Sequence, residues 1–313
     1  MKRTLLSLAC FLLLASTYAQ SEKDSVYMFC YFKGNGLDGL HYAFSKDGLK
    51  YEALNNDSTF LRPVVAKDKL MRDPCIIRGA DGLFRLVWTV SWNDKGIGIA
   101  SSKDLTHWSE QQFLPVMENE VSDSVMNAWA PEITYDPYTK EYMLYWSSTV
   151  KGKFLETKHP EDKYNHRLYY KTTKDFKTYS DTKLLYDGGF DIIDATIKVL
   201  GKKNYLMFLK DETLVPVLQK NLRTAKSEHL TEGYSKPSEP ITGKYWAEGP
   251  TALNMNGKWI VYFDKYREHK YGAVTSTDLK TWTDISSEIE LPKGLRHGTV
   301  FTISTEEFNK WFK

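Results

Sequence analysis

The sequence predicts an all-β fold, a five-bladed β-propeller whose ring is closed by the C-terminal strand joining the N-terminal blade. The first observation behind this prediction is a recurring strand start that carries a polar residue, and the second is a turn motif that repeats in phase with it. The strand starts lie at Asp73, Glu132, Asp194, Glu248 and His297, with gaps of 59, 62, 54 and 49 residues. Because the inner strands of a propeller converge on one axis, we expect these four carboxyl groups and the imidazole to meet there.

The first blade is expected to begin at Arg72, where three apolar runs follow one another. Its strands are predicted over 72–78, 84–90, 96–102 and about 108–114, with a Gly-Ala-Asp-Gly turn at 79–82. The next three blades repeat this order at 130–135, 142–148, 167–173 and 182–186; at 194–200, 204–210, 222–227 and about 237–241; and at 248–254, 258–264, 271–277 and about 282–289.

The fifth blade is expected to combine the two ends of the chain. A turn motif with a leading hydroxyl group follows each third strand, at Ser102, Thr173, Ser227 and Thr277, and a further copy begins at Ser45. That copy follows runs at 26–32 and 40–45 that lack a first strand, whereas 297–303 resembles a first strand with nothing after it. Joining them removes the free edges of an open ring. An all-β sandwich with chance spacing is the alternative.

Residues 1–19 have the pattern of a secretory signal peptide. Lys2 and Arg3 precede an apolar stretch over 5–14, and Ala19 ends a plausible cleavage site. The apolar stretch is too short for a membrane-spanning helix. We therefore expect an exported protein, periplasmic or secreted, in which residues 20–313 form a single propeller domain. Lipid attachment at Cys10 is an alternative to free export.

Charge and cysteine content exclude several classes of protein. Without residues 1–19 the chain has 40 basic and 40 acidic residues, so no basic surplus favours nucleic acid. Only Cys30 and Cys75 then remain, too few for a disulfide framework or a zinc site. We expect two buried thiols, and a single Cys30–Cys75 disulfide stays an alternative.

Three acidic residues at the strand starts suggest hydrolytic chemistry. Asp73 lies in Arg-Asp-Pro, Glu248 in Glu-Gly-Pro, and Asp194 within an apolar run. Buried carboxyl groups are costly unless they are paired or protonated, so three in register indicate a shared purpose. Cleavage of a glycosidic bond requires one protonated and one ionised carboxyl group, and a third raises the pKa of the acid.

These motifs resemble those of glycoside hydrolase family 43, whose members are five-bladed propellers, mostly arabinofuranosidases, xylosidases and endo-arabinanases. The resemblance extends over about 26–303 and implies Asp73 as general base, Glu248 as general acid and Asp194 as the residue that orients the acid and tunes its pKa. It also implies inversion, with base and acid about 6.5–9.5 Å apart. The Asn-Asp-Pro and Glu-Cys motifs of related fructan-active propellers are absent.

The resemblance also extends to His297 and Glu132. His297 matches the axial histidine that contacts a central cation or an ordered water in several members, so it is a candidate metal ligand, and a structural calcium ion near it is an alternative to a hydrogen-bonding role. Glu132 matches a position that is usually acidic and structural. From its place after the second strand of the fourth blade, Arg267 is expected either to pair with Asp194 or to lie at the surface.

Aromatic residues near the strand ends are candidates for sugar contacts. Trp92, Asn93, Trp129 and Trp246 are expected at the rim of the site, where tryptophan faces stack on sugar rings. Arg267 and His297 are further candidates for substrate binding. The insertion at 151–165 carries Phe154, which would close one side and favour attack at chain ends.

The sequence therefore predicts an exo-acting α-L-arabinofuranosidase that acts on side chains of plant polysaccharides. β-Xylosidase and β-D-galactofuranosidase activities are close alternatives, because the shape of the site decides between sugars. A non-catalytic carbohydrate-binding propeller would lack one of the acids, and a protein-binding scaffold would lack axial acids altogether. We expect a monomer with an oligo- or polysaccharide substrate and no required cofactor.

Overall fold

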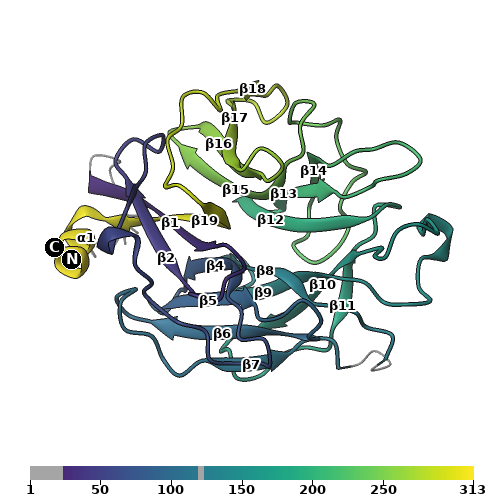
Figure 1. Cartoon of the computed structure of the whole chain (residues 1–313), viewed down its shortest axis with the longest axis horizontal. Coiled ribbons are helices and arrows are strands. Elements are labelled where there is room, and N and C mark those ends of the chain that lie inside the picture. The colour runs from purple at the N-terminus through teal and green to yellow at the C-terminus, as the bar shows by residue number, and fades with distance from the viewer. Residues whose placement is uncertain (1–23, 119–122) are drawn as a thin grey trace, which may run out of the picture.

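The computed structural model describes residues 24–118 and 123–313. The predicted signal peptide and Cys10 lie outside the described residues. Five sheets are arranged around a common centre, and the first strand of each sheet lies nearest to it (Figure 1). The inner strands contact one another in ring order, and the last contacts the first. The predicted five-bladed β-propeller is confirmed.

Each blade is a short antiparallel sheet whose first strand along the ring order is the inner one. The first two blades hold β4 (Arg72–Arg78), β5 (Phe84–Thr89), β6 (Gly96–Ser102) and β7 (Gln112–Pro115), then β8 (Trp129–Asp136), β9 (Glu141–Ser148), β10 (Arg167–Thr173) and β11 (Lys183–Tyr186). The next two hold β12 (Ile192–Gly201), β13 (Asn204–Asp211) and β14 (Asn221–Ser227), then β15 (Glu248–Met255), β16 (Lys258–Lys265), β17 (Lys270–Ser276) and β18 (Thr283–Asp284).

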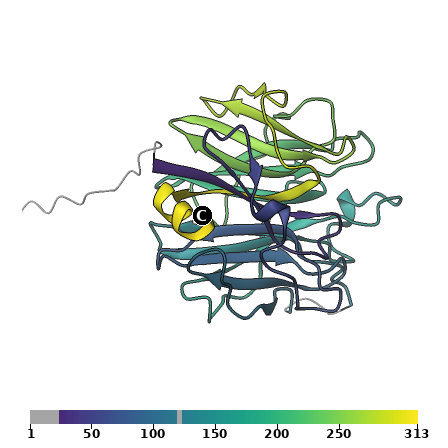
Figure 2. The same cartoon turned by 60° about the vertical axis from the view of Figure 1, so that its left-hand side comes forward.

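The closing blade joins the two ends of the described chain, as predicted. Its inner strand is β19 (Leu295–Ser304), which pairs with β1 (Ser25–Lys33), and β2 (His41–Ser45) and β3 (Glu52–Ala53) follow. Helix α1 (Thr305–Phe312) continues from β19 and packs beside β1 and β19 at the edge of the ring (Figure 2). Ser304 and Glu307 form a capping box at its start, which stabilises the first turn of the helix. No helix in the described ranges is long and apolar enough to cross a membrane.

The fourth strand predicted at about 237–241 in the third blade is wrong. Ser235, Ser238 and Ile241 donate backbone hydrogen bonds to β14 at intervals of three residues, not the two that a ladder requires. Pro237 and Pro240 stand between these donors and have no N–H group of their own. The segment therefore runs along β14 without forming a strand.

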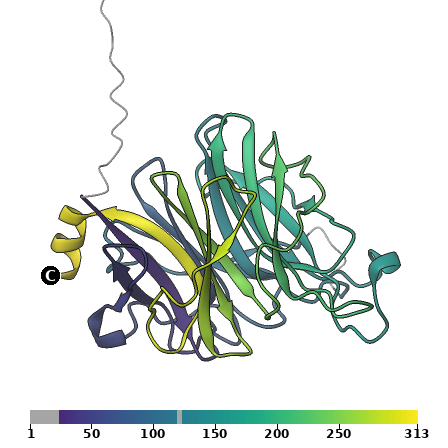
Figure 3. The same ribbon diagram turned by 90° about the horizontal axis from the view of Figure 1, so that it is seen from above.

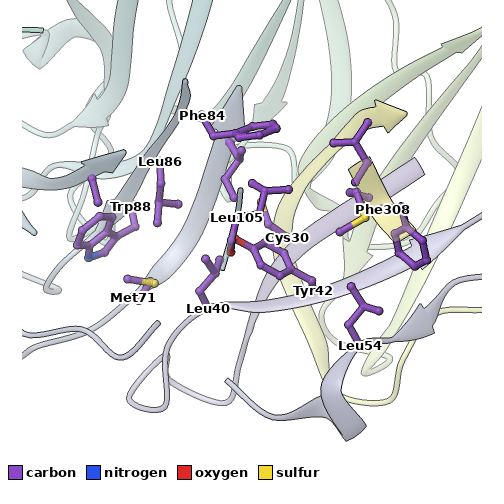
Figure 4. Packing of buried hydrophobic residues seen from close by; sticks show 14 of the residues in the cluster. Cys30, Leu40, Tyr42, Leu54, Met71, Phe84, Leu86, Trp88, Leu105 and Phe308 are labelled. Carbon is purple, nitrogen blue, oxygen red and sulfur yellow. The ribbon is translucent and has the colours of Figure 1, made fainter. Parts of the chain in front are cut away.

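The core consists of five apolar clusters, one between each pair of neighbouring blades. Between the closing blade and the first blade, Cys30 and Tyr42 face Phe84, Leu86 and Trp88 (Figure 4). Burying a side chain of this size contributes about 1.5–3 kcal/mol. Ring closure therefore rests on packing as well as on the β1–β19 ladder. Cys30 and Cys75 are buried free thiols, so the alternative of a disulfide between them is wrong.

The repeated turn motif fixes the exit from the third strand in four blades. In the first blade, the Ser102 hydroxyl accepts the backbone N–H groups of Asp104 and Leu105, and Leu105 adopts a left-handed φ of 65°. The same turn recurs at Ser45, Thr173 and Ser276, one residue before the start predicted in the fourth blade. The insertion that holds the short 3₁₀ helix Leu155–Thr157 projects on the side opposite to α1 (Figure 3).

Candidate active site

A β-bulge near the start of each inner strand positions the predicted site. Two residues of the strand stay unpaired in each bulge, and the first of them is Asp73, Ala130, Asp194 or Gly249 in the first four blades. All four have a left-handed backbone, with φ between 46° and 61°. A Cβ atom on Gly249 would lie 2.4 Å from Cγ of His297, so only glycine fits there. The bulges turn Asp73 and Asp194 toward the axis, and Glu248 precedes its bulge by one residue.

Asp73 is held as a carboxylate. Its Oδ2 accepts a hydrogen bond from the Thr89 hydroxyl at 2.9 Å, and its Oδ1 lies 3.4 Å from Nδ1 of His297. Burial alone would raise the pKa of Asp73, but the hydrogen bond and charge of His297 lower it to about 2. Thr89 also accepts the backbone N–H of Ala130 at 2.8 Å, which ties Asp73 to the second blade.

Asp194 has the opposite protonation tendency. Its Oδ2 accepts the backbone N–H of Gly249 at 3.0 Å and lies 3.9 Å from Nδ1 of His297. Burial raises the pKa of Asp194 to about 6; His297 opposes this effect and the charge of Glu248 adds to it. Two carboxyl groups that share one histidine therefore differ in protonation between about pH 2 and 6.

Glu248 is surrounded by cations. Its Oε2 lies 3.0 Å from Nζ of Lys210, and its Oε1 lies 3.3 Å from a guanidinium nitrogen of Arg296. Burial favours the neutral acid, but the charge and hydrogen bond of Lys210 and the charge of Arg296 outweigh it and lower the pKa of Glu248. Nε of Arg296 also binds Asp264 at 2.6 Å.

His297 carries a proton over a wide pH range. Burial lowers its pKa, but the carboxylates of Asp194 and Asp73 outweigh burial and raise it to about 9. Calcium prefers six to eight oxygen ligands. Within 24–118 and 123–313, no group of three or more His, Cys, Asp or Glu side chains is arranged to hold a metal ion. The residues around His297 therefore do not fit a protein-ligated calcium, and its contacts are those of a hydrogen-bonding histidine.

Glu132 does not share the site with Asp73, contrary to the expectation that all five strand starts are equivalent. The bulge places Ala130 where the first blade has Asp73, and Glu132 lies two residues further along β8. Its Oε2 accepts hydrogen bonds from Thr196 at 2.7 Å and Tyr145 at 3.2 Å. With residues of the other four inner strands, Glu132 lines a separate axial cavity of about 420 Å³. These contacts agree with the structural role expected for it.

The aromatic residues form two groups beside the carboxyl groups. Trp92, which is 41% exposed, packs edge-on against Trp129 with ring centres 5.6 Å apart. Trp129 in turn contacts Tyr164 of the insertion at 4.8 Å. Asn93 is exposed beside Trp92, and its backbone N–H binds Ser91. Phe154 packs against Arg167 instead, so Tyr164 is the insertion residue that meets this group.

The second group lies near Glu248. The guanidinium group of Arg267 covers one face of Trp246, 4.4 Å from the ring centre, and Tyr266 lies on Trp246 at 5.7 Å. The alternative in which Arg267 pairs with Asp194 is therefore wrong, since the cation nearest to Asp194 is His297. Arg267 is exposed in the loop after β16, as the surface alternative predicts, and its side chain extends over the tryptophan.

Sequence reasoning missed the second ring of residues that supports the carboxyl groups. The last residue of each second strand, or the last but one, lies directly opposite the residue before the bulge. These ladder pairs are Arg72 with Thr89, Trp129 with Ser147, Ile193 with Lys210 and Glu248 with Asp264. A polar residue at the end of an apolar run was the available signal for Lys210 and Asp264. Arg296 stands beside His297, yet nothing in the sequence marked it as a partner of Glu248.

Carboxyl groups in contrasting environments, converging on the axis of a five-bladed ring, define a glycoside hydrolase site. A family model described as "Probable glycosyl hydrolase domain", related to family 43, matches residues 22–309. The chain therefore belongs to the glycoside hydrolase family 43 group and is a glycosidase that acts on saccharides. No curated protein sequence matches it.

Solved structures share the fold at low sequence identity. A thermostable family-43 glycoside hydrolase has a TM-score of 0.58 at 16% identity, over 74% of this chain and 82% of its own. An α-L-arabinofuranosidase from Lactobacillus brevis has a TM-score of 0.53 at 19% identity, over 69% of this chain and 72% of its own. A xylan β-1,4-xylosidase from Bacillus halodurans C-125 has a TM-score of 0.55 at 17% identity, over 75% of this chain and 43% of its own.

Proposed function

We propose that the protein is an inverting, exo-acting α-L-arabinofuranosidase that removes side chains from plant polysaccharides. Asp73 is the general base that activates water, Glu248 is the general acid that protonates the leaving oxygen, and Asp194 orients the acid and tunes its pKa. Water and these carboxyl groups supply the whole reaction, so the proposal requires no cofactor.

The contrast between Asp73 and Asp194 supports this proposal most directly. The pKa of Asp73 falls to about 2, because His297 outweighs the effect of burial, whereas burial raises the pKa of Asp194 to about 6. A base must be ionised at the working pH, and the acid side of the reaction needs a carboxyl group that retains a proton. Asp73 meets the first requirement, and Asp194, with a pKa of about 6, is the carboxyl group near Glu248 that retains its proton to higher pH.

Glu248 must gain a proton before it can act as an acid. In the free enzyme Lys210 and Arg296 each contact one of its oxygens and favour the ionised form. A substrate whose glycosidic oxygen binds beside Glu248 would displace water from the carboxyl group. It would also bring an oxygen that can accept the proton of Glu248. We infer that the acid takes up its proton as the substrate enters, with Asp194 as its neighbour on the axis.

The aromatic groups supply surfaces for sugar rings. Trp92 is exposed beside Arg72, which is the neighbour of Asp73 in sequence, and Trp246 stands two residues before Glu248. One face of each ring is covered by an arginine, Arg72 or Arg267, so a sugar would use the edge or the other face. The Tyr164 contact with Trp129 supports a closed side and attack at chain ends.

The sugar, the location and the assembly are parts of the same proposal. The arabinofuranosidase and the xylosidase among the similar structures support α-L-arabinofuranoside and β-D-xyloside as the first substrates to test. Export to the periplasm or outside the cell rests on the signal-like residues 1–19, and attachment of lipid to Cys10 is its variant. We propose a monomer.

Turnover of nitrophenyl glycosides tests the proposal. The panel holds α-L-arabinofuranoside, β-D-xyloside, β-D-galactofuranoside and β-D-galactopyranoside, each assayed with the wild type and with Asp73→Asn. Preferred hydrolysis of the arabinofuranoside, lost in the variant and with inversion seen by NMR of the first product, supports it. If another glycoside is preferred, that sugar replaces arabinofuranose in the proposal. Retention of the anomeric configuration would overturn the inverting mechanism.

A further inference from the structure

Lys210 is a buried cation bound to two acids. Its side chain is 1% exposed, and its Nζ lies 2.6 Å from Glu212 and 3.0 Å from Glu248. The phenol oxygen of Tyr266 lies 3.4 Å away, and its ring covers the ammonium group at 4.5 Å. An ammonium group removed from water requires such partners, because burying an unpaired charge costs several kcal/mol. Lys210 is therefore held in one place by three side chains.

Glu248 receives its most direct contact from this lysine. Arg296 also contacts Glu248, but its Nε makes the shorter contact with Asp264, at 2.6 Å against 3.3 Å for Glu248. Burial lowers the pKa of Lys210, yet the charges of Glu248 and Glu212 outweigh it and raise the pKa well above its usual range. These contacts therefore favour the charged form of Lys210.

We propose that Lys210 is a positioning residue, which fixes the carboxyl group of Glu248 and, balanced by Glu212, sets the pH range in which Glu248 carries its proton. This inference rests on the proposed role of Glu248 as the acid. Lys210 is the last residue but one of β13, and it lies opposite Ile193, the residue before Asp194 in the neighbouring strand. The β12–β13 ladder therefore carries both Lys210 and Asp194.

Glu212 competes with Glu248 for the ammonium group of Lys210, because both carboxylates contact its Nζ. It follows β13 directly and also pairs with Lys220, which precedes β14, so both ends of the β13–β14 loop meet at Glu212. A neutral residue at 212 would leave Lys210 to Glu248 alone. The two changes, at 210 and at 212, are therefore expected to move the protonation of Glu248 in opposite directions.

Other charged groups around Glu248 must stay in place for this test. They come from every strand packed against it and are Arg296 and His297 in β19, Asp194 in β12, Asp264 in β16 and Tyr271 in β17. Neither substitution replaces any of them, although the loss of Lys210 also removes a cation that lowers the pKa of Asp194. Lys171 in the second blade serves as the control, because it is also buried and paired, with Glu118 at 2.5 Å, far along the ring from Glu248.

The experiment measures kcat/KM against pH on an aryl arabinofuranoside with a poor leaving group, or on the best glycoside of the panel. In Lys210→Met the basic limb should move to higher pH by about 1–3 pH units, since loss of a nearby cation raises a carboxyl pKa. In Glu212→Gln it should move to lower pH, and in Lys171→Met it should stay. The inference is overturned if the basic limb of the pH profile is unchanged in Lys210→Met and Glu212→Gln, or if it moves in the same direction in both.

A second measurement needs no turnover. Carboxyl carbons of ¹³C-labelled glutamate are titrated by NMR, and the Glu248 signal is assigned by its loss in Glu248→Gln. Opposite changes of its midpoint in Lys210→Met and Glu212→Gln support the inference even if no glycoside is hydrolysed, an outcome that would defeat only the proposed function. If Lys210→Met does not fold, the Glu212→Gln titration decides alone, and an unchanged midpoint there overturns the inference.

Discussion

Asp73 and Asp194 occupy the same bulge position in two different blades, and both lie within 4 Å of one histidine nitrogen, Nδ1 of His297. Both have a left-handed backbone, at φ 50° and 54°. Left-handed residues other than glycine are uncommon and cluster at functional sites. The propeller therefore uses one backbone conformation twice to place two carboxyl groups, whose pKa values are shifted in opposite directions, around one cation.

Replacing Asp73 by Asn is expected to abolish turnover and leave the fold intact. Asparagine tolerates the left-handed backbone, but it has no charge with which to activate water. Loss of a general base costs about 10²–10⁴-fold in kcat, and an activated leaving group does not restore it. Steady-state assays give the rate, and thermal melts check the fold. The same exchange at Asp175, in an exposed turn of the second blade, should leave kcat unchanged.

Replacing Glu248 by Gln is expected to separate substrates by leaving group. The amide keeps the size of the side chain but has no acidic proton, so glycosides with poor leaving groups should lose about 10²–10⁴-fold in kcat. Activated nitrophenyl substrates should lose much less, and calorimetry should show that sugars still bind. An equal loss on both kinds of substrate would contradict the assignment of Glu248 as the acid.

The contribution of His297 to stability should depend on pH. Its folded pKa is about 9, above the usual 6.5, because Asp194 and Asp73 outweigh the effect of burial. A raised histidine pKa stabilises the folded protein fully below about pH 6.5, and this stabilisation is lost as pH rises through about 9. The melting temperature of His297→Gln should therefore fall furthest below that of the wild type at about pH 6, and the difference should narrow toward pH 10. A constant difference would show that His297 is not charged in the fold.

The inner strands could be predicted from the sequence because each is marked by neighbouring residues, a polar residue followed by an apolar run. Asp73 and Asp194 stand out as acids at the start of apolar runs, and the repeat places them on one axis without any knowledge of contacts. Glu132 has the same local signal but lies two residues from the equivalent position, since the bulge register is a property of the paired strands. The sequence pattern alone therefore cannot distinguish an acid at the bulge, which enters the site, from one two residues later, which lines the separate axial cavity.

The supporting residues escaped because their role depends on pairing. Lys210 follows an apolar run, as many surface lysines do, and only the β12–β13 register shows that it is buried beside Glu248. No sequence motif distinguishes the partner of Arg296 from the partner of Arg267. The structure assigns the first to Glu248 and Asp264 and the second to the face of Trp246. Two visible signals were passed over, the prolines at 237 and 240 and the capping box at Ser304.

Thr89 is expected to contribute to stability through its hydroxyl group alone. The hydroxyl donates to Asp73 and accepts from the N–H of Ala130, and the residue is buried. Thr89→Val keeps the volume but leaves both partners unsatisfied, which should lower the free energy of unfolding by about 1–3 kcal/mol. Thr89→Ser keeps the hydroxyl and should lose less. Denaturant unfolding measures both, and equal losses would show that the methyl group, not the hydrogen bonds, matters.

Adding a single Cβ atom at Gly298 is expected to weaken the strand pair that closes the ring. In β19 this glycine faces β1 so closely that a Cβ atom would lie 1.9 Å from the backbone oxygen of Cys30. Backbone has little room to move in a paired strand, so Gly298→Ala is expected to lower the free energy of unfolding by about 1–3 kcal/mol, the usual cost of overpacking. Gly201→Ala, at the end of β12 with no atom within 4 Å of the added Cβ, is the control and should change little. Denaturant unfolding of both variants measures the difference. Equal stabilities would mean that the β1–β19 pair can separate without cost, and that packing between the closing and first blades holds the ring together.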